Sequence, residues 1–190
     1  MRRPRIMACR DVAYPPGSSC FFEALNYTSS VSETRWKRAK TTEIGGGARL
    51  FYNGEDSKRN YVAIAVAKFM KDSVSAVTKI CSRLMFVMID TKEGYWTLIS
   101  VYAPQAGCLV YEKDEFYLSL DEAIPSVRER DYLTIAGNFS GHVGSETMGL
   151  EKVHGSRGAG VRNEEAERAL ALAIAHDMAV CSTFFAKRKS

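Results

Sequence analysis

The segment from Leu133 to His142 carries the polar side chains whose types and spacing come closest to a reactive site. An apolar run, Leu-Thr-Ile-Ala, leads into a glycine, and Asn138 and Ser140 follow on either side of a phenylalanine. An amide and a hydroxyl can orient a ligand through hydrogen bonds. Neither group accepts a proton as a carboxylate does, and neither adds negative charge beside a metal ion. The segment therefore predicts a polar turn that lacks a general base.

Three further segments have residues that could contact phosphate groups. Basic side chains flank an aromatic in the stretch from Arg35 to Lys40, directly after Glu33, and this mixture suits a nucleic-acid backbone and a nearby base. A solvated polar loop explains the same stretch equally well. The glycine-rich loop from His154 to Glu164 leads into a helix and could present backbone N–H groups to phosphate. Tyr102, in Tyr-Ala-Pro-Gln, either contacts a ligand or only packs before the proline that ends its strand.

Four segments in this order resemble motifs of the endonuclease/exonuclease/phosphatase family, which are magnesium-dependent phosphodiesterases with the DNase I-like fold. The four segments are Ser32–Trp36, Ser100–Gln105, Gly137–Ser140 and His154–Glu164. The pieces Glu-Thr-Arg-Trp-Lys, Tyr-Ala-Pro-Gln, Gly-His-Val-Gly and Arg-Asn-Glu-Glu are most similar to the endonuclease domains of RTE-type non-LTR retrotransposons. They also resemble the craniofacial development protein 2-like sequences that are related to those domains.

The resemblance implies a role for each matching residue. Glu33 would bind the divalent ion, Mg²⁺ or alternatively Mn²⁺, and the Tyr102 hydroxyl would contact the substrate phosphate. In the family's Gly-Asp-Phe-Asn motif the Asp helps activate the attacking water and the Asn hydrogen-bonds the scissile phosphate. Asn138 and Ser140 therefore stand at two catalytic positions in altered form. The residues implied to bind the DNA substrate are Arg35, Trp36, Lys37 and Asn163.

The chain departs from the family in ways that predict lost catalysis and weakened metal binding. Replacing the Asp by Asn138 and the Asn by Ser140 removes groups whose loss costs about 10²–10⁴-fold each in rate. Residues 1–31 hold no counterpart of the family's N-terminal strand, and the C-terminal Ser-Asp-His motif would lie beyond Ser190. The same missing strands predict marginal stability and self-association through unpaired strand edges.

Composition and charge limit the class of protein. A length of 190 residues suits one domain, and 46% hydrophobic with 25% charged residues argues against disorder. A net charge of +4 permits DNA as a partner without requiring it. The scattered five cysteines and three histidines favour neither a disulfide scaffold nor a zinc module, so a reducing nuclear or cytoplasmic compartment is expected, with a mitochondrial presequence as the alternative. Neither a membrane span nor a small-molecule cofactor is expected.

Hydrophobic periodicity places most strands before the helices. Thr91–Gly94 has the composition of a hairpin turn between two apolar runs. Helical spacing predicts one helix from Glu112 to about Val127 and a second from Asn163 to about His176. The expected strands are Arg49–Tyr52, Tyr61–Lys68, Val74–Ile80, Leu84–Ile89, Trp96–Tyr102, Tyr132–Ala136 and Met178–Phe185.

Hairpins followed by helix–strand units predict an α/β (α+β) fold class. The resemblance makes this an incomplete DNase I-like four-layer α/β/β/α sandwich with mixed, largely antiparallel sheets. Residues 1–31 are expected to form a divergent, irregular N-terminal segment. Residues 32–190 are expected to form a partial family domain that lacks its C-terminal part.

Three functions are compatible with these features. The first is a retrotransposon-derived endonuclease-like domain that has lost activity. The second is a weakly active magnesium-dependent DNA endonuclease in which Glu146 or Asp131 replaces the missing Asp. The third is a non-catalytic module that binds nucleic acid or a protein.

Overall fold

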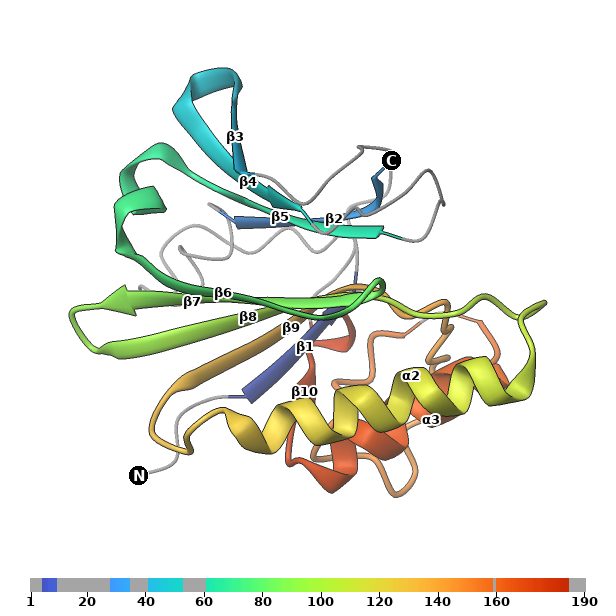
Figure 1. Ribbon diagram of the computed structural model, residues 1–190. Coiled ribbons are helices and arrows are strands. Elements are labelled where there is room, and N and C mark those ends of the chain that lie inside the picture. Colours follow the sequence, from blue (N-terminus) through green and yellow to red (C-terminus); the bar gives the residue numbers. More distant parts are fainter. Residues whose placement is uncertain (1–4, 10–27, 35–40, 53–60, 159, 185–190) are drawn as a thin grey trace.

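The computed structural model describes residues 5–9, 28–34, 41–52, 61–158 and 160–184, with the backbone alone for 8–9, 28–34 and 61 (Figure 1). The strands are β1 Arg5–Cys9, β2 Thr28–Thr34, β3 Thr41–Ile44, β4 Ala48–Tyr52, β5 Tyr61–Val66, β6 Val74–Cys81, β7 Leu84–Thr91, β8 Gly94–Tyr102, β9 Tyr132–Asn138 and β10 Ala179–Val180. The α-helices are α2 Val110–Ala123 and α3 Glu164–Ala175. Short 3₁₀ segments are η1 Gly45–Gly47, η2 Lys68–Ser73, η3 Ile124–Ser126 and η4 Cys181–Thr183.

The strands form two sheets that face each other. One has the order β10-β1-β9-β8-β7-β6, and the other has the order β2-β5-β4-β3. Pairing is parallel for β10–β1, β1–β9 and β9–β8, and antiparallel for β8–β7, β7–β6 and every pair of the four-stranded sheet. The expected α+β class with largely antiparallel sheets is thereby confirmed. The self-association expected at strand edges stays a prediction.

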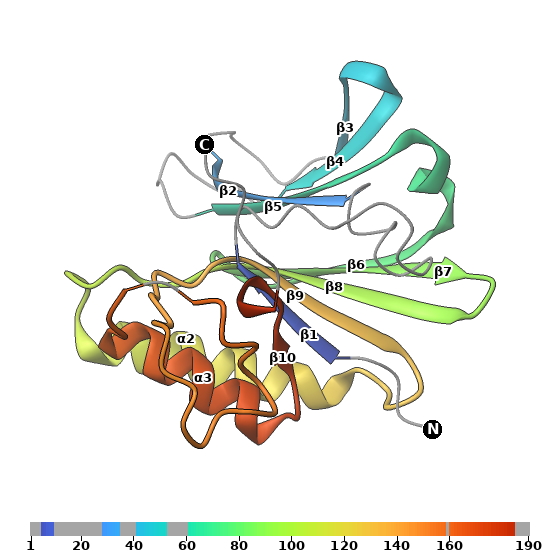
Figure 2. The same cartoon turned by 180° about the vertical axis from the view of Figure 1, so that it is seen from behind.

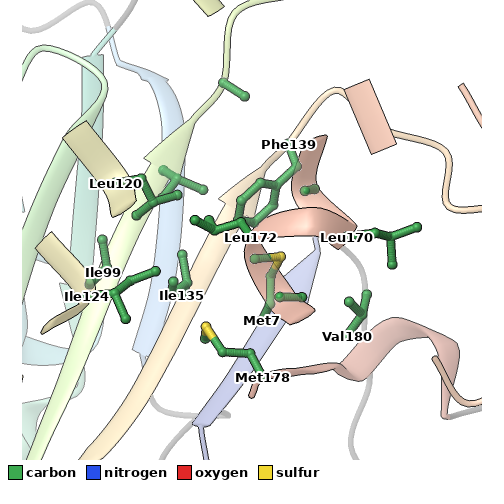
Figure 3. Close-up of a cluster of buried hydrophobic side chains, with 14 of the residues drawn as sticks. Met7, Ile99, Leu120, Ile124, Ile135, Phe139, Leu170, Leu172, Met178 and Val180 are labelled. Carbon is green, nitrogen blue, oxygen red and sulfur yellow. The ribbon is translucent and has the colours of Figure 1, made fainter. Parts of the chain in front are cut away.

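Two apolar cores hold three layers together. Between the sheets, Phe51 and Ile64 pack with Trp96 and Leu98 of the six-stranded sheet. On that sheet's other face α2 and α3 lie side by side (Figure 2), and the buried side chains of both helices meet those of β8 and β9 (Figure 3). Within the described part of the chain, no helix combines the length and the apolar character that a membrane crossing requires.

The predicted local elements agree with the structure where the pattern was strong. The expected hairpin around Thr91–Gly94 joins β7 and β8, with Leu84 opposite Val101 at its far end. The second predicted helix begins at its expected first turn, with Asn163 as N-cap and His176 as C-cap.

Two expectations at the ends of the chain are wrong. Residues 1–31 were expected to be irregular, but Arg5–Cys9 forms β1, between β9 and β10 and with Met7 almost fully buried. The strand expected over Met178–Phe185 is only the two residues of β10, because the Thr183 hydroxyl donates to the Val180 carbonyl oxygen at 2.7 Å and the chain turns into η4. Phe185 lies outside the described residues, and a domain boundary at residue 32 stays a prediction.

Candidate functional site

Two of the predicted site residues lie side by side at the carboxyl ends of β8 and β9. In the parallel register of these strands Tyr102 is the partner of Asn138, the last residue of each strand. The Ala103 N–H donates to the Asn138 carbonyl oxygen at 2.8 Å and extends this pairing by one residue. Because carboxyl ends of neighbouring parallel strands meet at one sheet edge, the side chains that follow them gather there.

Asn138 uses its amide oxygen to shape the turn that carries Ser140. The Ser140 N–H donates to Asn138 Oδ1 at 2.8 Å, which is an Asx turn. Ser140 has a φ of 54°, in the left-handed region, and its hydroxyl lies 3.5 Å from the Ala103 carbonyl oxygen. Asn138 and Ser140 are therefore brought together with Tyr102, but the group closest to a base is a neutral amide already bonded to the backbone.

Asn163 joins this turn to α3. Its Oδ1 accepts from Ala166 N at 3.1 Å, which caps the helix, and from His142 N at 2.8 Å. Its Nδ2 donates to the Ser140 carbonyl oxygen at 3.3 Å. Asn163, which the sequence predicted to bind substrate, thus uses its side-chain amide to hold residues 140–142 against the helix N-terminus. Its contacts in this structure are those of a positioning residue.

Tyr102 is buried, with 4% of its surface exposed, and its hydroxyl accepts from Gln105 Nε2 at 3.2 Å. Arg83, in the turn between β6 and β7, donates from Nη1 to the Tyr102 carbonyl oxygen at 3.2 Å. Its guanidinium carbon also lies 5.4 Å from the centre of the Tyr102 ring, which is a cation–π contact. The sequence pattern did not single out Arg83. The sheet order reveals it, because β7 pairs with β8 and brings the start of one strand to the end of the other.

Glu33, the predicted metal ligand, lies in β2 at an irregularity in the pairing with β5. The backbone of β2 packs against β8 and β9 across the sheet interface. The Glu33 side chain and residues Arg35, Trp36 and Lys37 lie outside the described part, so their roles stay predictions. Mg²⁺ prefers carboxylate oxygens, whereas Tyr102, Asn138 and Ser140 offer none. The described donors do not by themselves fit a magnesium site.

Asp131 cannot replace the missing carboxylate. It precedes β9, seven residues before Asn138, so about 20 Å of extended strand separates them. It is also buried and accepts from Arg128 Nε at 2.9 Å. Glu146 is exposed on the loop after His142, where its carbonyl oxygen accepts from Arg162 Nη2 at 2.7 Å. Glu146 as a substitute ligand stays a prediction.

The chain is similar to craniofacial development protein 2. It is 27% identical to the Bos taurus protein over 137 residues, which are 72% of this chain and 23% of that protein. It is 26% identical to the Tragulus javanicus protein over 137 residues, which cover 24% of that protein. The chain therefore spans about a quarter of the length of the curated relatives it matches. The search against protein-family models found no match.

The similarity to craniofacial development protein 2 confirms one part of the expected resemblance. The assignment to the endonuclease/exonuclease/phosphatase family, the metal and the DNA substrate stay predictions. The short Tyr-Ala-Pro and Gly-Asn-Phe-Ser motifs carry that assignment, and the structure places both at one sheet edge.

The loop between Gly141 and Gly160 is held by a buried histidine that the sequence pattern did not single out. His154 is 3% exposed and forms an isolated parallel bridge with Val180 of β10. Its Nδ1 accepts from Ser156 N at 3.1 Å, so Nε2 carries the proton and donates to the Gly144 carbonyl oxygen at 3.1 Å. The ring is therefore a neutral tautomer whose two nitrogens are both used, and burial lowers the pKa of His154.

Acidification is expected to destabilise the fold through His154. Its pKa is lower in the folded chain than in the unfolded chain, where a histidine titrates near 6.5. The stabilisation is complete above about pH 6.5 and is lost as the pH falls below it, since the unfolded state takes up the proton more readily. Urea midpoints at pH 7.5 and 5.5 measure this loss. His154→Gln should reduce the difference between the urea midpoints at the two pH values, whereas the exposed control His142→Gln should leave that difference unchanged. The same pH dependence in both variants would show that another group is responsible.

Proposed function

We propose that this chain is a retrotransposon-derived, endonuclease-like domain of the magnesium-dependent phosphodiesterase family that no longer hydrolyses phosphodiesters. The observation that carries the proposal is the neutral Asn138 beside Tyr102 at the ends of two parallel strands. In the family that the chain resembles, a carboxylate occupies that position and helps to activate the attacking water. An amide there cannot take the proton of the attacking water, so the step that makes a nucleophile lacks its base.

The geometry around Ser140 supports an asparagine-bearing ancestor. Its φ of 54° falls in the left-handed region, which asparagine adopts several-fold more readily than most residues other than glycine. Asn163 and Asn138 both form hydrogen bonds with the Ser140 backbone, so an asparagine at position 140 would require no change in the conformation of this turn. The turn therefore keeps a shape suited to the Gly-Asp-Phe-Asn motif although its side chains have changed.

The activity is tested by nicking of supercoiled plasmid in Mg²⁺ or Mn²⁺. We expect no nicking by the parent chain above a chelator control. Nicking that disappears with chelator and with Glu33→Ala would make the chain a weakly active endonuclease and contradict the proposal. Intact plasmid that is bound in a salt-sensitive manner would instead favour a non-catalytic nucleic-acid-binding module.

The ancestral metal site is tested separately from activity by titration with Mn²⁺. Asn138→Asp with Ser140→Asn should tighten Mn²⁺ binding by about 10- to 100-fold, the range over which groups around a metal site change affinity. Glu33→Ala in this background should remove the gain, whereas Asp131→Asn, at the far end of β9, is a matched control that should not. If the tighter Mn²⁺ binding persisted in Glu33→Ala, the metal would be bound elsewhere. That result would contradict the proposal that this sheet edge is the family's metal site.

A further inference from the structure

The outward face of α2 exposes large apolar side chains among carboxylates. Phe116 and Leu120 point into the core, and the opposite side of the helix carries Tyr111 and Leu118, which are 65% and 59% exposed. These two residues are seven apart, so they lie on one stripe two turns apart. Glu115 and Glu122 fall on the same stripe, three residues before and four residues after Leu118.

The neighbouring helix α3 continues this face. Two contacts join the helices side by side: an ion pair of Arg168 Nη1 with Asp114 Oδ1, and a hydrogen bond between His176 Nε2 and Asp121 Oδ1 at 2.7 Å. Leu118 lies between the two aspartates along α2. Between Arg168 and His176, α3 exposes its small side chains, Ala171 and Ala175, and then Ile174, which is 53% exposed.

We name as the acidic–apolar face the six exposed residues Tyr111, Glu115, Leu118, Glu122, Glu167 and Ile174. Both helices lie on the same side of the six-stranded sheet (Figures 1 and 2). None of the three glutamates forms an ion pair with any side chain in the described ranges. Their charges are therefore available to an external group.

The acidity of the two helices is local and opposes the charge of the whole chain. Their segments hold eight acidic and two basic side chains, a net charge of −6, whereas the chain carries +4. The rest of the chain therefore carries +10. A net charge of −6 repels a polyanion, so this side of the molecule does not suit nucleic acid. It suits a partner that brings positive charge.

One exposed leucine needs no explanation, because single surface apolar residues are common. The combination here is more specific, since Tyr111 and Leu118 lie on one exposed stripe of α2 and carboxylates share that stripe. A third helix matches such a stripe when its own apolar residues recur with a 3.6-residue period. Lysine or arginine on both sides of its apolar stripe would then meet Glu115, Glu122 and Glu167.

We propose that the acidic–apolar face binds a basic amphipathic helix of a partner protein. The partner helix places its apolar side chains against the exposed Tyr111, Leu118 and Ile174 and its cations against the three glutamates of this face. The interaction lies on a different surface from the edge that carries Tyr102 and Asn138, so it does not depend on the function proposed above. The net charge of the two helices disfavours an acidic partner or a nucleic acid at this face.

The test uses two fluorescein-labelled peptides of 14 residues, of the same leucine and lysine composition. In the first peptide the leucines follow the helical period; in the second their order is permuted so that no apolar stripe forms. We expect the full chain to bind the periodic peptide about tenfold more tightly by fluorescence anisotropy, with an affinity that falls as salt rises. Equal binding of the two peptides would overturn the proposal.

Variants of the chain locate the site. Leu118→Ser with Ile174→Ser should remove the preference for the periodic peptide, and Glu115→Gln with Glu122→Gln should weaken binding and flatten its salt dependence. Phe69→Ser in η2 is the matched control, because Phe69 is 66% exposed and lies outside this face. Unfolding curves establish that each variant is folded. Unchanged binding by the Leu118/Ile174 variant, or an equal loss in the Phe69 variant, would contradict the assignment.

Discussion

Substitution of Gly137 by alanine is expected to lower the free energy of unfolding by about 3–5 kcal/mol, a large fraction of the 5–15 kcal/mol typical of a domain. Gly137 lies in β9, between Cys9 of β1 and Val101 of β8. Its φ is 145°, and a Cβ there would fall 2.0 Å from the Val101 carbonyl oxygen. The methyl group therefore meets backbone on a neighbouring strand, which cannot move aside as a flexible side chain does.

The same substitution should disturb the candidate site. Gly137 immediately precedes Asn138, and the clash is with the residue immediately before Tyr102. Relief of the clash requires β8 and β9 to separate at the edge where the two predicted catalytic residues meet. We therefore expect any ligand binding at that edge to be lost together with stability.

Two other glycines separate the causes of this loss. Gly149 also has a positive φ, 76°, but nothing lies within 4 Å of the position that a Cβ would take, so Gly149→Ala reports the backbone strain alone, about 1–2 kcal/mol. Gly107 has neither a positive φ nor a close neighbour, so Gly107→Ala should change stability little. Urea unfolding of the three variants gives the comparison. A loss at Gly137 no larger than that at Gly149 would show that the strands relax around the methyl group.

The elements that sequence reasoning located are those with a strong local pattern. The hairpin of β7 and β8 has a glycine-containing turn between two apolar runs, and α3 has a cap residue at Asn163 followed by an acidic first turn. These signals act over a few residues, so tertiary contacts are not needed to recognise them. The fold class followed from the order of the elements.

The elements that sequence reasoning missed depend on contacts between distant segments. β1 is five residues long and begins with arginine, and its parallel partners β9 and β10 lie more than a hundred residues away. Parallel neighbours on both sides bury Ile6 and Met7, and no alternation within five residues reveals such a strand. β10 ends early because Thr183 bonds to Val180 and to Gly155, and the Gly155 contact comes from a separate loop.

Sequence motifs supplied the candidate residues of this site, whose roles stay predictions, but not the residues that hold them in place. Tyr102, Asn138 and Ser140 come from motifs at strand ends, and the register places them together. Arg83 and His154 were not recognised, because a single arginine in a turn and a histidine in a glycine-rich loop carry no pattern of their own. Their importance comes from what surrounds them: a tyrosine ring in one case and two backbone groups in the other.

Replacement of Lys113 by methionine is expected to lower the free energy of unfolding by about 3 kcal/mol, because it leaves a carboxylate without its partner inside the protein. Lys113 Nζ donates to Glu165 Oε1 at 2.9 Å, and the two side chains are only 7% and 8% exposed. The same ammonium donates to the Ala106 carbonyl oxygen at 3.2 Å. The pair thus joins the start of α2 and the loop before it to the first turn of α3.

The pH dependence identifies the mechanism. The hydrogen bond from Lys113 lowers the pKa of Glu165 below its ordinary value, so the pair stabilises the fold above the unfolded pKa of about 4.3 and less as the pH falls through the folded pKa. In Lys113→Met the unpaired carboxylate is relieved by protonation instead. In urea unfolding experiments, the difference in the free energy of unfolding between the parent chain and Lys113→Met should therefore be largest near pH 7 and should become smaller towards pH 4.

Two further variants distinguish a buried pair from an ordinary ion pair. Lys113→Met with Glu165→Leu removes both charges and should recover much of the lost stability, since two apolar side chains can replace a buried pair at little cost. Arg168→Met breaks a neighbouring pair whose partner, Asp114, has a side chain that is 59% exposed, and it should cost below about 1 kcal/mol. If the double variant were as unstable as Lys113→Met, the loss would come from packing of the lysine stem. In that case the ion pair would help to position α3 but would contribute little to the free energy of unfolding.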